Sequence, residues 1–484
     1  MPKQTAGEGR QGASTIGAEF EDAKLGDQRR TARLVKLAKA FGESPSASIP
    51  DAMASHADED AAYRFLSNEA ITASAVLQPH IQQTVGRAAA ATSIVVAHDT
   101  TDFDFGGAAK RVGMGRLRGE KGQGFFAHVS LAISADATRR PLGLLALCTH
   151  ARVGKKRSNK TKAGHNRSGA DYAKRTNKES ARWLTQVQSA EQQFGSPGVL
   201  VHVMDREADA FPLLASMVEN ETRFVVRLAR DRVARVEPEQ ESFKVRALVA
   251  QAEDGFALEV PVAARSEKRA PRANKVSGAR VARVAQVGFR AMRVELRRPH
   301  YVTEGPPWLQ VNVVEVHELN PPSDADRIDW ILLTTEPIET PADIYSVVQH
   351  YRARWLIEEF FKALKTGCAI EKRQLETYDA MVNLLAILAP IAWQMLALRD
   401  WARSSPDSPA TVVLTPTRLK VLRACGRMKL SDAPTVREAL FAIAALGGHH
   451  IKRDPGWIVL GRGMEKLVAL ESGWMAHQLA VQEM

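Results

Sequence analysis

The chain has 484 residues, which is long enough to bury a sizeable core and too long for one ordinary domain, so we expect two to four domains. Its hydrophobic content of 45% and charged content of 25% are those of a soluble globular protein. Lys and Arg (66) exceed Asp and Glu (55) by 11, which favours a polyanionic partner such as nucleic acid or an acidic membrane surface. The three cysteines, Cys148, Cys368 and Cys425, form no CxxC pair, which argues against a disulfide framework or a structural zinc site and favours a reducing cytoplasm.

The N-terminal segment lacks the apolar core of a signal peptide. One later stretch, Met381 to Leu398, is apolar enough to raise the question of a membrane span. It contains Asn383, Gln394 and a central Pro390, and it follows a highly charged helix, so we expect a buried core helix.

A small helical module is expected up to about residue 90. Asp27 has the position of an N-cap, and Leu34, Leu37 and Ala38 form one apolar stripe of the helix that follows. The same helix carries basic residues at helical spacing, namely Arg29, Arg30, Arg33 and Lys36. Taken alone, this pattern favours a solvated charged face.

An α/β core is expected after this module, because strands then alternate with helices. Ser93 to His98 is a buried-strand pattern that ends at Asp99, and Gly198 to Met204 is another that ends at Asp205. The other predicted strands are Ala127–Ser134, Leu142–Leu147, Arg223–Leu228 and Asp329–Thr334, with a Gly-rich basic turn region at 113–124 and helices around 178–194, 208–220 and 341–366.

Two segments, 152–182 and 265–298, are strongly basic, each with eleven Lys or Arg against two acids. The first has the Gly and Asn content of a loop, and the alternation after Arg280 in the second suggests exposed β-strands. Each is compatible with a solvated surface, but two such blocks beside a carboxylate site favour a track for a polyphosphate chain.

Asp99 and Asp205 each follow a short apolar strand, where a side chain is held rigidly at the edge of a sheet. Two carboxylates that converge repel each other unless a cation neutralises them, and hard ions such as Mg²⁺ prefer oxygen ligands. Considered singly, either aspartate is better explained as a turn or N-cap residue.

The helix around Glu358 supplies a third acid. At about 100° per residue, Tyr351, Arg354, Glu358 and Lys365 fall on one face about 60° wide, while Glu359 is turned about 100° away. The opposite side carries Ile357, Phe360 and Leu364, which we expect to face a core. Such a face suits metal-assisted phosphate chemistry, with Glu358 on a metal, Arg354 and Lys365 on phosphate oxygens, and Tyr351 donating a hydrogen bond. The alternative is a salt bridge between Arg354 and Glu358, four residues apart on an exposed helix.

These residues carry a family resemblance. The pattern Tyr351-x2-Arg354-x3-Glu358-x6-Lys365 resembles the YREK signature of DDE transposases of the insertion sequence 4 family, the Tn-five-like transposases. Asp99-Thr100-Thr101 resembles the family's DTT motif, and the five residues from Asp205 to Asp209 match its DREAD motif. Further similarities lie in Trp330–Pro337 (the strand before the glutamate helix), Leu25–Arg33 and Tyr63–Phe65 (the DNA-end-binding module), and Pro455–Trp457 with Gly461–Gly463 (the C-terminal region). The basic loop at 152–182 departs from the family pattern.

The resemblance implies an RNase H-like catalytic core over residues 91–374, in which Asp99 lies on the first strand and Asp205 just after the fourth. A largely β insertion would occupy about 210–325. It also implies a helical DNA-end-binding domain over 1–90, where Arg29, Arg30 and Arg33 would contact DNA, and a helical dimerisation region over 375–484.

By the same analogy, Asp99, Asp205 and Glu358 hold two Mg²⁺ ions per active site, for which Mn²⁺ can substitute. The implied reaction is cut-and-paste transposition: a 3′ nick, a hairpin, its opening, and transfer of the 3′ end into target DNA. Trp330 matches the family tryptophan beside a flipped base, although a tryptophan on a core strand is ordinarily packing. Arg227 and Arg230 are further expected phosphate contacts.

The expected partners are double-stranded DNA, as transposon ends and as target, and a second copy of the chain in the synaptic complex. No membrane is expected, and the location would be the bacterial cytoplasm, at the nucleoid. Two alternatives remain open: a metal-dependent nuclease or resolvase of the same fold, and a non-catalytic DNA-binding inhibitor.

Overall fold

The protein is a mixed α/β structure. A computed structural model describes residues 16–106, 110–117, 122–152, 179–253, 255–264, 268–269, 276–277, 281–322, 327–450 and 454–482. The chain divides into a first compact unit (Met1–Ala90, Thr100–Lys155 and Leu356–Met484) and a second compact unit (Ala91–Asp99 and Lys156–Trp355). Strand β1 (Ile94–Asp104) contributes residues to both units.

The first unit begins with the predicted helical module. Asp27 caps α1, its side chain accepting the Arg29 N–H, and the apolar stripe of α1 is buried at Leu34, Leu37 and Ala38, so these predictions are confirmed. The elements of this module are η1 (Ile16–Phe20), α1 (Gln28–Glu43), α2 (Ile49–Ala52), α3 (His56–Leu66) and α4 (Ala73–Ala88).

A group of strands follows in the first unit, built around the antiparallel pair β3 (Gln123–Ser134) and β4 (Pro141–His150). Strand β3 is also hydrogen-bonded to β1 and to the two-residue strand β2 (Gly115–Arg116), which lies where a Gly-rich turn was expected. Helices α4 and α11 both contact β4, so the hairpin is covered by helices.

The long apolar helix is buried, as predicted. Helix α11 (Tyr378–Ser404) is long and apolar enough to cross a membrane by length and composition, but 78% of its most apolar window lies inside the structure. The polar side chain of Asn383 is accommodated in this core helix because its N–H groups donate to the carbonyl oxygens of Leu66 and Ile71. Pro390 lies inside the helix.

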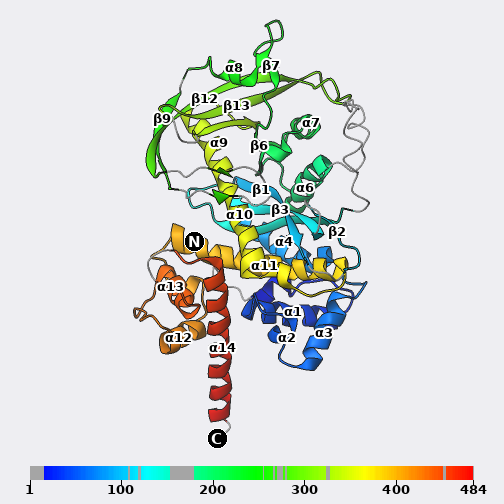
Figure 1. Cartoon of the computed structure of the whole chain (residues 1–484), viewed down its shortest axis with the longest axis vertical. Helices are drawn as coiled ribbons and strands as arrows, with labels where there is room; N and C mark the ends of the chain where they lie inside the picture. Colours follow the sequence, from blue (N-terminus) through cyan, green and yellow to red (C-terminus); the bar gives the residue numbers. More distant parts are fainter. Residues whose placement is uncertain are drawn as a thin grey trace, which may run out of the picture. The chain divides into compact units, whose positions relative to one another are not determined.

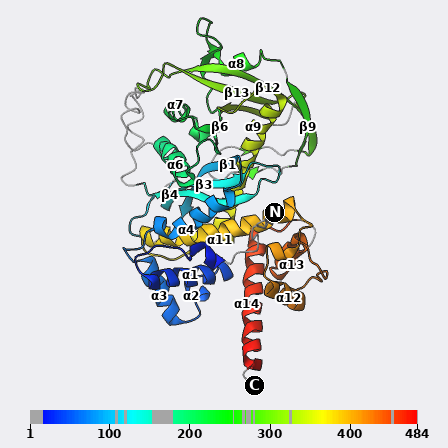
Figure 2. The same cartoon turned by 180° about the vertical axis from the view of Figure 1, so that it is seen from behind.

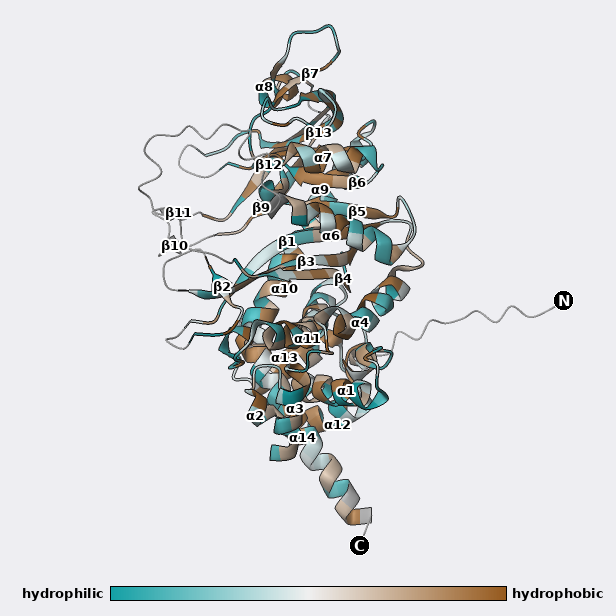
Figure 3. Ribbon diagram, turned by 90° about the vertical axis from the view of Figure 1, so that its right-hand side faces the viewer, coloured by the Kyte–Doolittle hydropathy of each residue, from teal (hydrophilic) through white to brown (hydrophobic). Residues whose placement is uncertain are grey.

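The rest of the first unit is helical. It contains α10 (Trp355–Lys362), the π-helical turn η4 (Ala363–Gly367), η5 (Ile370–Lys372), η6 (Ala410–Val412), α12 (Pro416–Cys425), α13 (Val436–Leu446) and α14 (Trp457–Gln482). Helices α12 and α13 pack beside the first half of α14, which extends as one long helix to the end of the described chain (Figure 1). The last turns of α14 mix hydrophilic and hydrophobic residues, and many of these side chains are exposed (Figure 3).

The second unit contains a sheet in which β1, β5 (Leu200–Met204) and β6 (Arg223–Arg227) are parallel. It continues through antiparallel pairs from β6 to β14 (Asp329–Thr334), β13 (Trp308–Glu318) and β12 (Arg283–Arg297). At the β12 end of this sheet lie the smaller strands β7 (Val233–Arg235), β8 (Phe243–Lys244) and β9 (Phe256–Val262). Strands β10 (Lys268–Arg269) and β11 (Val276–Ser277) form a separate two-stranded sheet.

Helices cover both faces of this sheet. Side chains of α6 (Glu179–Phe194), α7 (Phe211–Glu219) and α8 (Val245–Val249) join one apolar cluster with β5, β6 and β12–β14. Helix α9 (Pro341–Ala353) contacts β5, β6 and β13 but has no residue in that cluster, which places it on the other face (Figure 2).

One of the predicted helices is corrected here. The helix expected over 341–366 is broken at Arg354 and ends in a π-helical turn, so a constant 100° per residue does not hold along it. The helix expected around 208–220 is α7 (Phe211–Glu219), and the short η3 (Arg206–Ala208) precedes it as a separate turn. The exposed strand expected after Arg280 is β12, in which Val284, Gln286, Arg293 and Arg297 are exposed although its backbone pairs with β13 on one side and with β7 and β9 on the other. The basic segment 153–178 lies outside the described residues, as do parts of 265–280.

Candidate functional site

The sequence pattern suggested that Asp99 follows the end of a strand. It lies instead inside strand β1. The strand continues to Asp104 because its second half is paired with β3, and Phe103 within that half is fully buried. Its placement on the first strand agrees with the expectation drawn from the resemblance. The interpretation of Asp99 as a turn or N-cap residue is wrong.

Asp205 directly follows β5, as predicted. Its Oδ1 accepts the Glu207 N–H at 2.8 Å, which makes Asp205 the N-cap of η3. The capping interpretation is therefore confirmed, and it leaves the carboxylate fixed at the carboxyl end of a buried strand.

The register of β1 and β5 relates the two aspartates. These parallel strands pair Val95 with Val201 and Ala97 with Val203. Asp99 and Asp205 each lie two residues after the last of these pairs, so the same register sets them level with each other. Neighbouring strands are about 4.8 Å apart, and residues two apart point to the same face. The opposite face at this level carries His98 and His202, which contact each other. Both aspartates therefore point to the α9 face.

Arg354 meets Asp99 on that face. Its Nη1 donates to Asp99 Oδ2 at 3.2 Å, and both side chains are largely buried. Arg354 comes directly after α9, so the end of this helix delivers a cation to the first aspartate. Arg354 competes with any metal ion for the Asp99 carboxylate, so an ion bound here would share Asp99 with the guanidinium. Both aspartates offer the oxygen donors that Mg²⁺ prefers.

A second cluster joins the ends of β6, β14 and α9. Tyr351 packs edge-on against Trp330 with ring centroids 5.3 Å apart, and the Arg227 guanidinium lies 5.6 Å from the centroid of the Trp330 ring. Burial lowers the pKa of Arg227, which hydrogen-bonds to Tyr351 and to the Asp329 carbonyl. Trp330 is partly buried, and it packs against Tyr351 and Arg227.

Asp209 organises the loop after β6, a role that the sequence analysis missed. Its buried carboxylate accepts the backbone N–H groups of Ala229 and Arg230 and the Nε–H of Arg232 at 2.8 Å. The side chain of Arg230 is exposed beside this anchored backbone. A signal was available, because Asp209 is the last acid of the motif that starts at Asp205.

Glu358 and Glu359 lie on α10 in the first unit and differ sharply. Glu358 is half-buried, whereas Glu359 is 8% exposed and bonded to Lys362, Arg399 and Trp457. Burial alone would raise the pKa of Glu359, but the hydrogen bond from Lys362 and the positive charge of Arg399 lower it. Ile357, Phe360 and Leu364 are buried, as predicted.

Lys365 lies in the π-helical turn η4, not on a regular continuation of α10. Its ammonium group donates to the Asp102 carbonyl and lies 3.6 Å from Glu371. Among the residues that the structure describes, no three His, Cys, Asp or Glu side chains are gathered into a group that could hold a metal ion.

The three N-terminal arginines are partly engaged within the first unit. Arg29 forms a salt bridge with Asp27, and Arg33 shares Asp58 with Lys36. Arg30 donates to the Leu25 carbonyl. The charged face of α1 therefore contains local ion pairs, as expected of a solvated surface.

Two protein-family models match the chain. Residues 13–71 match the transposase DNA-binding model, and residues 155–393 match the transposase DDE domain model. The first range contains the arginines of α1, and the second contains Asp205, Glu358 and the residues from Tyr351 to Lys365. Asp99 precedes the second match.

Proposed function

We propose that this DDE transposase carries out cut-and-paste DNA transposition of the insertion sequence 4 type: a 3′ nick, hairpin formation and opening, and strand transfer into target DNA. The DNA-binding and DDE domains support a transposase that binds DNA and cleaves or transfers it. The observation that carries the proposal is the register of β1 and β5, which sets Asp99 level with Asp205 on the face where Arg354 lies.

DDE transposases are generally dependent on divalent metal ions. We propose that Asp99, Asp205 and Glu358 are the ligands, with two Mg²⁺ ions per site or Mn²⁺ in their place. When bound, such ions would supply the Lewis acidity that activates water or a 3′-hydroxyl for an in-line displacement at phosphorus.

The protein's own groups would position DNA for this chemistry. Arg354 has five N–H donors and could contact Asp99 and a phosphate oxygen together, while Lys365 would hold a second phosphate oxygen. Tyr351 and Trp330, which contact each other, would receive a base extruded during hairpin formation. Arg227, Arg230 and the α1 arginines (Arg29, Arg30, Arg33) would bind phosphates along the duplex.

The proposed organisation is a DNA-end-binding domain over 1–90, an RNase H-like core over 91–374 with a β-rich insertion at about 210–325, and a dimerisation region over 375–484. Double-stranded DNA is the partner, and two copies of the chain would hold two transposon ends together. A cytoplasmic location at the nucleoid is consistent with this function.

The test is a cleavage and strand-transfer assay with Mg²⁺ on a plasmid that carries candidate ends from the flanking DNA. The variants are Asp205→Asn and Glu358→Ala. Hairpin-ended fragments and joined products from the unmodified protein, with none from either variant, would support transposition. Nicks without joining would instead favour a nuclease or resolvase. Binding without cleavage by all three proteins would leave a DNA-binding inhibitor.

A further inference from the structure

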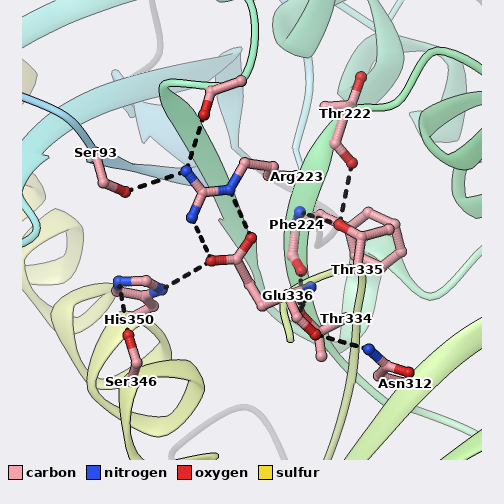
Figure 4. Close-up of polar contacts among 11 residues, drawn as sticks. Ser93, Thr222, Arg223, Phe224, Asn312, Thr334, Thr335, Glu336, Ser346 and His350 are labelled. Carbon is pink, nitrogen blue, oxygen red and sulfur yellow. Dashed lines mark hydrogen bonds and ion pairs between the residues drawn. The ribbon is translucent and has the colours of Figure 1, made fainter. Parts of the chain in front are cut away.

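A buried ion pair lies at the end of the second unit's sheet where the parallel strands begin. Arg223, the first residue of β6, binds Glu336 through two parallel hydrogen bonds, Nε to Oε1 at 2.7 Å and Nη2 to Oε2 at 2.6 Å (Figure 4). Glu336 is only 4% exposed. Such a bidentate pair fixes the relative orientation of both groups as well as their separation.

The remaining N–H groups of Arg223 reach two other strands. Nη1 donates to the Gly198 carbonyl at 2.9 Å, just before β5, and lies 3.4 Å from the Ser93 hydroxyl, just before β1 (Figure 4). One guanidinium therefore joins the starts of β1, β5 and β6. Further along these strands, Asp99 lies inside β1 and Asp205 directly follows β5.

The backbone at Glu336 is held from two sides. Its N–H donates to the Thr334 hydroxyl at 3.0 Å, and its carbonyl accepts from Asn312 Nδ2 at 2.7 Å. The backbone from which the Glu336 side chain projects is therefore held in place. Its carboxylate faces His350 on helix α9.

His350 is the contact on that helix. Its ring is almost fully buried, with Nδ1 3.8 Å from Glu336 Oε2 and Nε2 3.5 Å from the Ser346 hydroxyl one turn earlier (Figure 4). His350 immediately precedes Tyr351, and four residues later Arg354 meets Asp99.

The apolar buried residues of α9 restrict its rotation less sharply than a directional contact does. Ile344, Val347 and Val348 are apolar, and the hydrophobic effect that buries them has no direction. A rotation of the helix about its axis would keep much of this burial while it moved Tyr351 away from Trp330. The contact at His350 opposes that rotation: at 3.8 Å it is longer than a hydrogen bond, so its contribution is the electrostatic attraction between the imidazole and the Glu336 carboxylate.

We propose that Glu336, held by Arg223, is a positioning residue for DNA cleavage: through His350 it sets the rotation of α9 and so aims Tyr351 at Trp330 and Arg354 at Asp99. The inference rests on the proposed function, since the aimed residues are those assigned to the DNA site. A misplacement of about 1 Å can cost about 100-fold in rate, so a small rotation would be sufficient.

The test variant is Glu336→Gln, which keeps the shape of the side chain and removes its charge. The chain offers a matched control: Arg283 and Glu318 form another buried bidentate pair in the same unit, at 2.9 and 2.8 Å, on β12 and β13. Glu318→Gln removes the same charge from a similar environment without touching α9. Both variants should lower the melting temperature.

The first readout is the single-turnover rate of the 3′ nick at saturating Mg²⁺ and DNA, below both melting temperatures. We expect Glu336→Gln to be at least tenfold slower and Glu318→Gln to stay within twofold of the unmodified protein. His350→Gln should be non-additive with Glu336→Gln and additive with Glu318→Gln. Equal slowing by both glutamine variants would reduce Glu336 to a stability residue and overturn the inference.

The second readout needs no activity. In protein labelled with fluorotyrosine, the ¹⁹F resonance of Tyr351 (assigned with Tyr351→Phe) reports the nearby Trp330 ring. It should move in Glu336→Gln and stay in Glu318→Gln. An unmoved resonance would overturn the inference even if the nick assay gave no product. Conversely, a moved resonance in a protein that never cleaves would count against the proposed function alone.

Discussion

The adjacent acids Glu358 and Glu359 should give opposite phenotypes when each is changed to Gln. Glu359 is buried against Arg399 at 2.8 Å and Lys362 at 2.6 Å, and it accepts the Trp457 N–H. Glu358 is half-buried on the same helix. The two substitutions are chemically identical and one position apart, so differences between them report the surroundings of each carboxylate.

The expected cost at Glu359 follows from its partners. Lys362 is half exposed, and a pair of that kind is worth about 0–1 kcal/mol. Arg399 is largely buried, and removing one partner of a buried pair costs about 3–5 kcal/mol because the other charge stays uncompensated. We therefore expect Glu359→Gln to lose about 3 kcal/mol of stability. Glu358→Gln should lose about 1 kcal/mol or less.

The expected effect on cleavage is reversed. Loss of a metal-ligating carboxylate removes several kcal/mol of transition-state stabilisation, and about 4 kcal/mol corresponds to about a thousandfold in rate. Glu358→Gln should therefore lose at least that factor in the single-turnover nick. Glu359→Gln should stay within tenfold below its melting temperature.

Circular-dichroism melting and a nick assay with end-labelled DNA measure the two quantities on the same preparations. An inactive Glu359→Gln with an unchanged melting temperature, beside an active Glu358→Gln, would refute the reasoning. That outcome would mean that the pairing of Glu359 with Arg399 does not determine its role.

Three further outcomes are expected. Burial raises the pKa of Asp400 from its usual 3.8 to about 7, so the contribution of Asp400 to stability is lost as the pH rises through that range. In thermal melts, Asp400→Asn should therefore stabilise the protein by about 1–3 kcal/mol more at pH 8 than at pH 5. Burial lowers the pKa of His80 below its usual 6.5, although Glu19 opposes the shift. The stability of the protein should therefore fall as the pH drops below 6.5. An equally steep fall in a His80→Gln variant would contradict this expectation. Trp330→Ala should leave the nick intact and reduce hairpins about 10–100-fold on denaturing gels, from the loss of about 1–3 kcal/mol of stacking, whereas Trp330→Phe should retain most of them.

Much of the candidate site follows from local sequence. Strand β14 has the predicted bounds, and β5 ends at Met204, directly before Asp205, because a short apolar run bounded by polar residues specifies a buried strand by itself. The Asp27 cap of α1 and the burial of α11 were equally predictable. The pattern around Glu358 predicted a helix there, and the structure has α10 at that place.

Other features depend on pairings that local patterns do not contain. Asp99 is inside a strand because β3 pairs with the residues after it, and Arg354 binds Asp99 across 255 positions of sequence. The interruption at Arg354 breaks the single helical face that periodicity had predicted. Glu336 likewise binds Arg223 across 113 positions of sequence and contacts His350 on the helix that follows. Periodicity encodes the conformation of one segment, whereas strand register and helix rotation are set by which segments meet, and only the folded chain decides that.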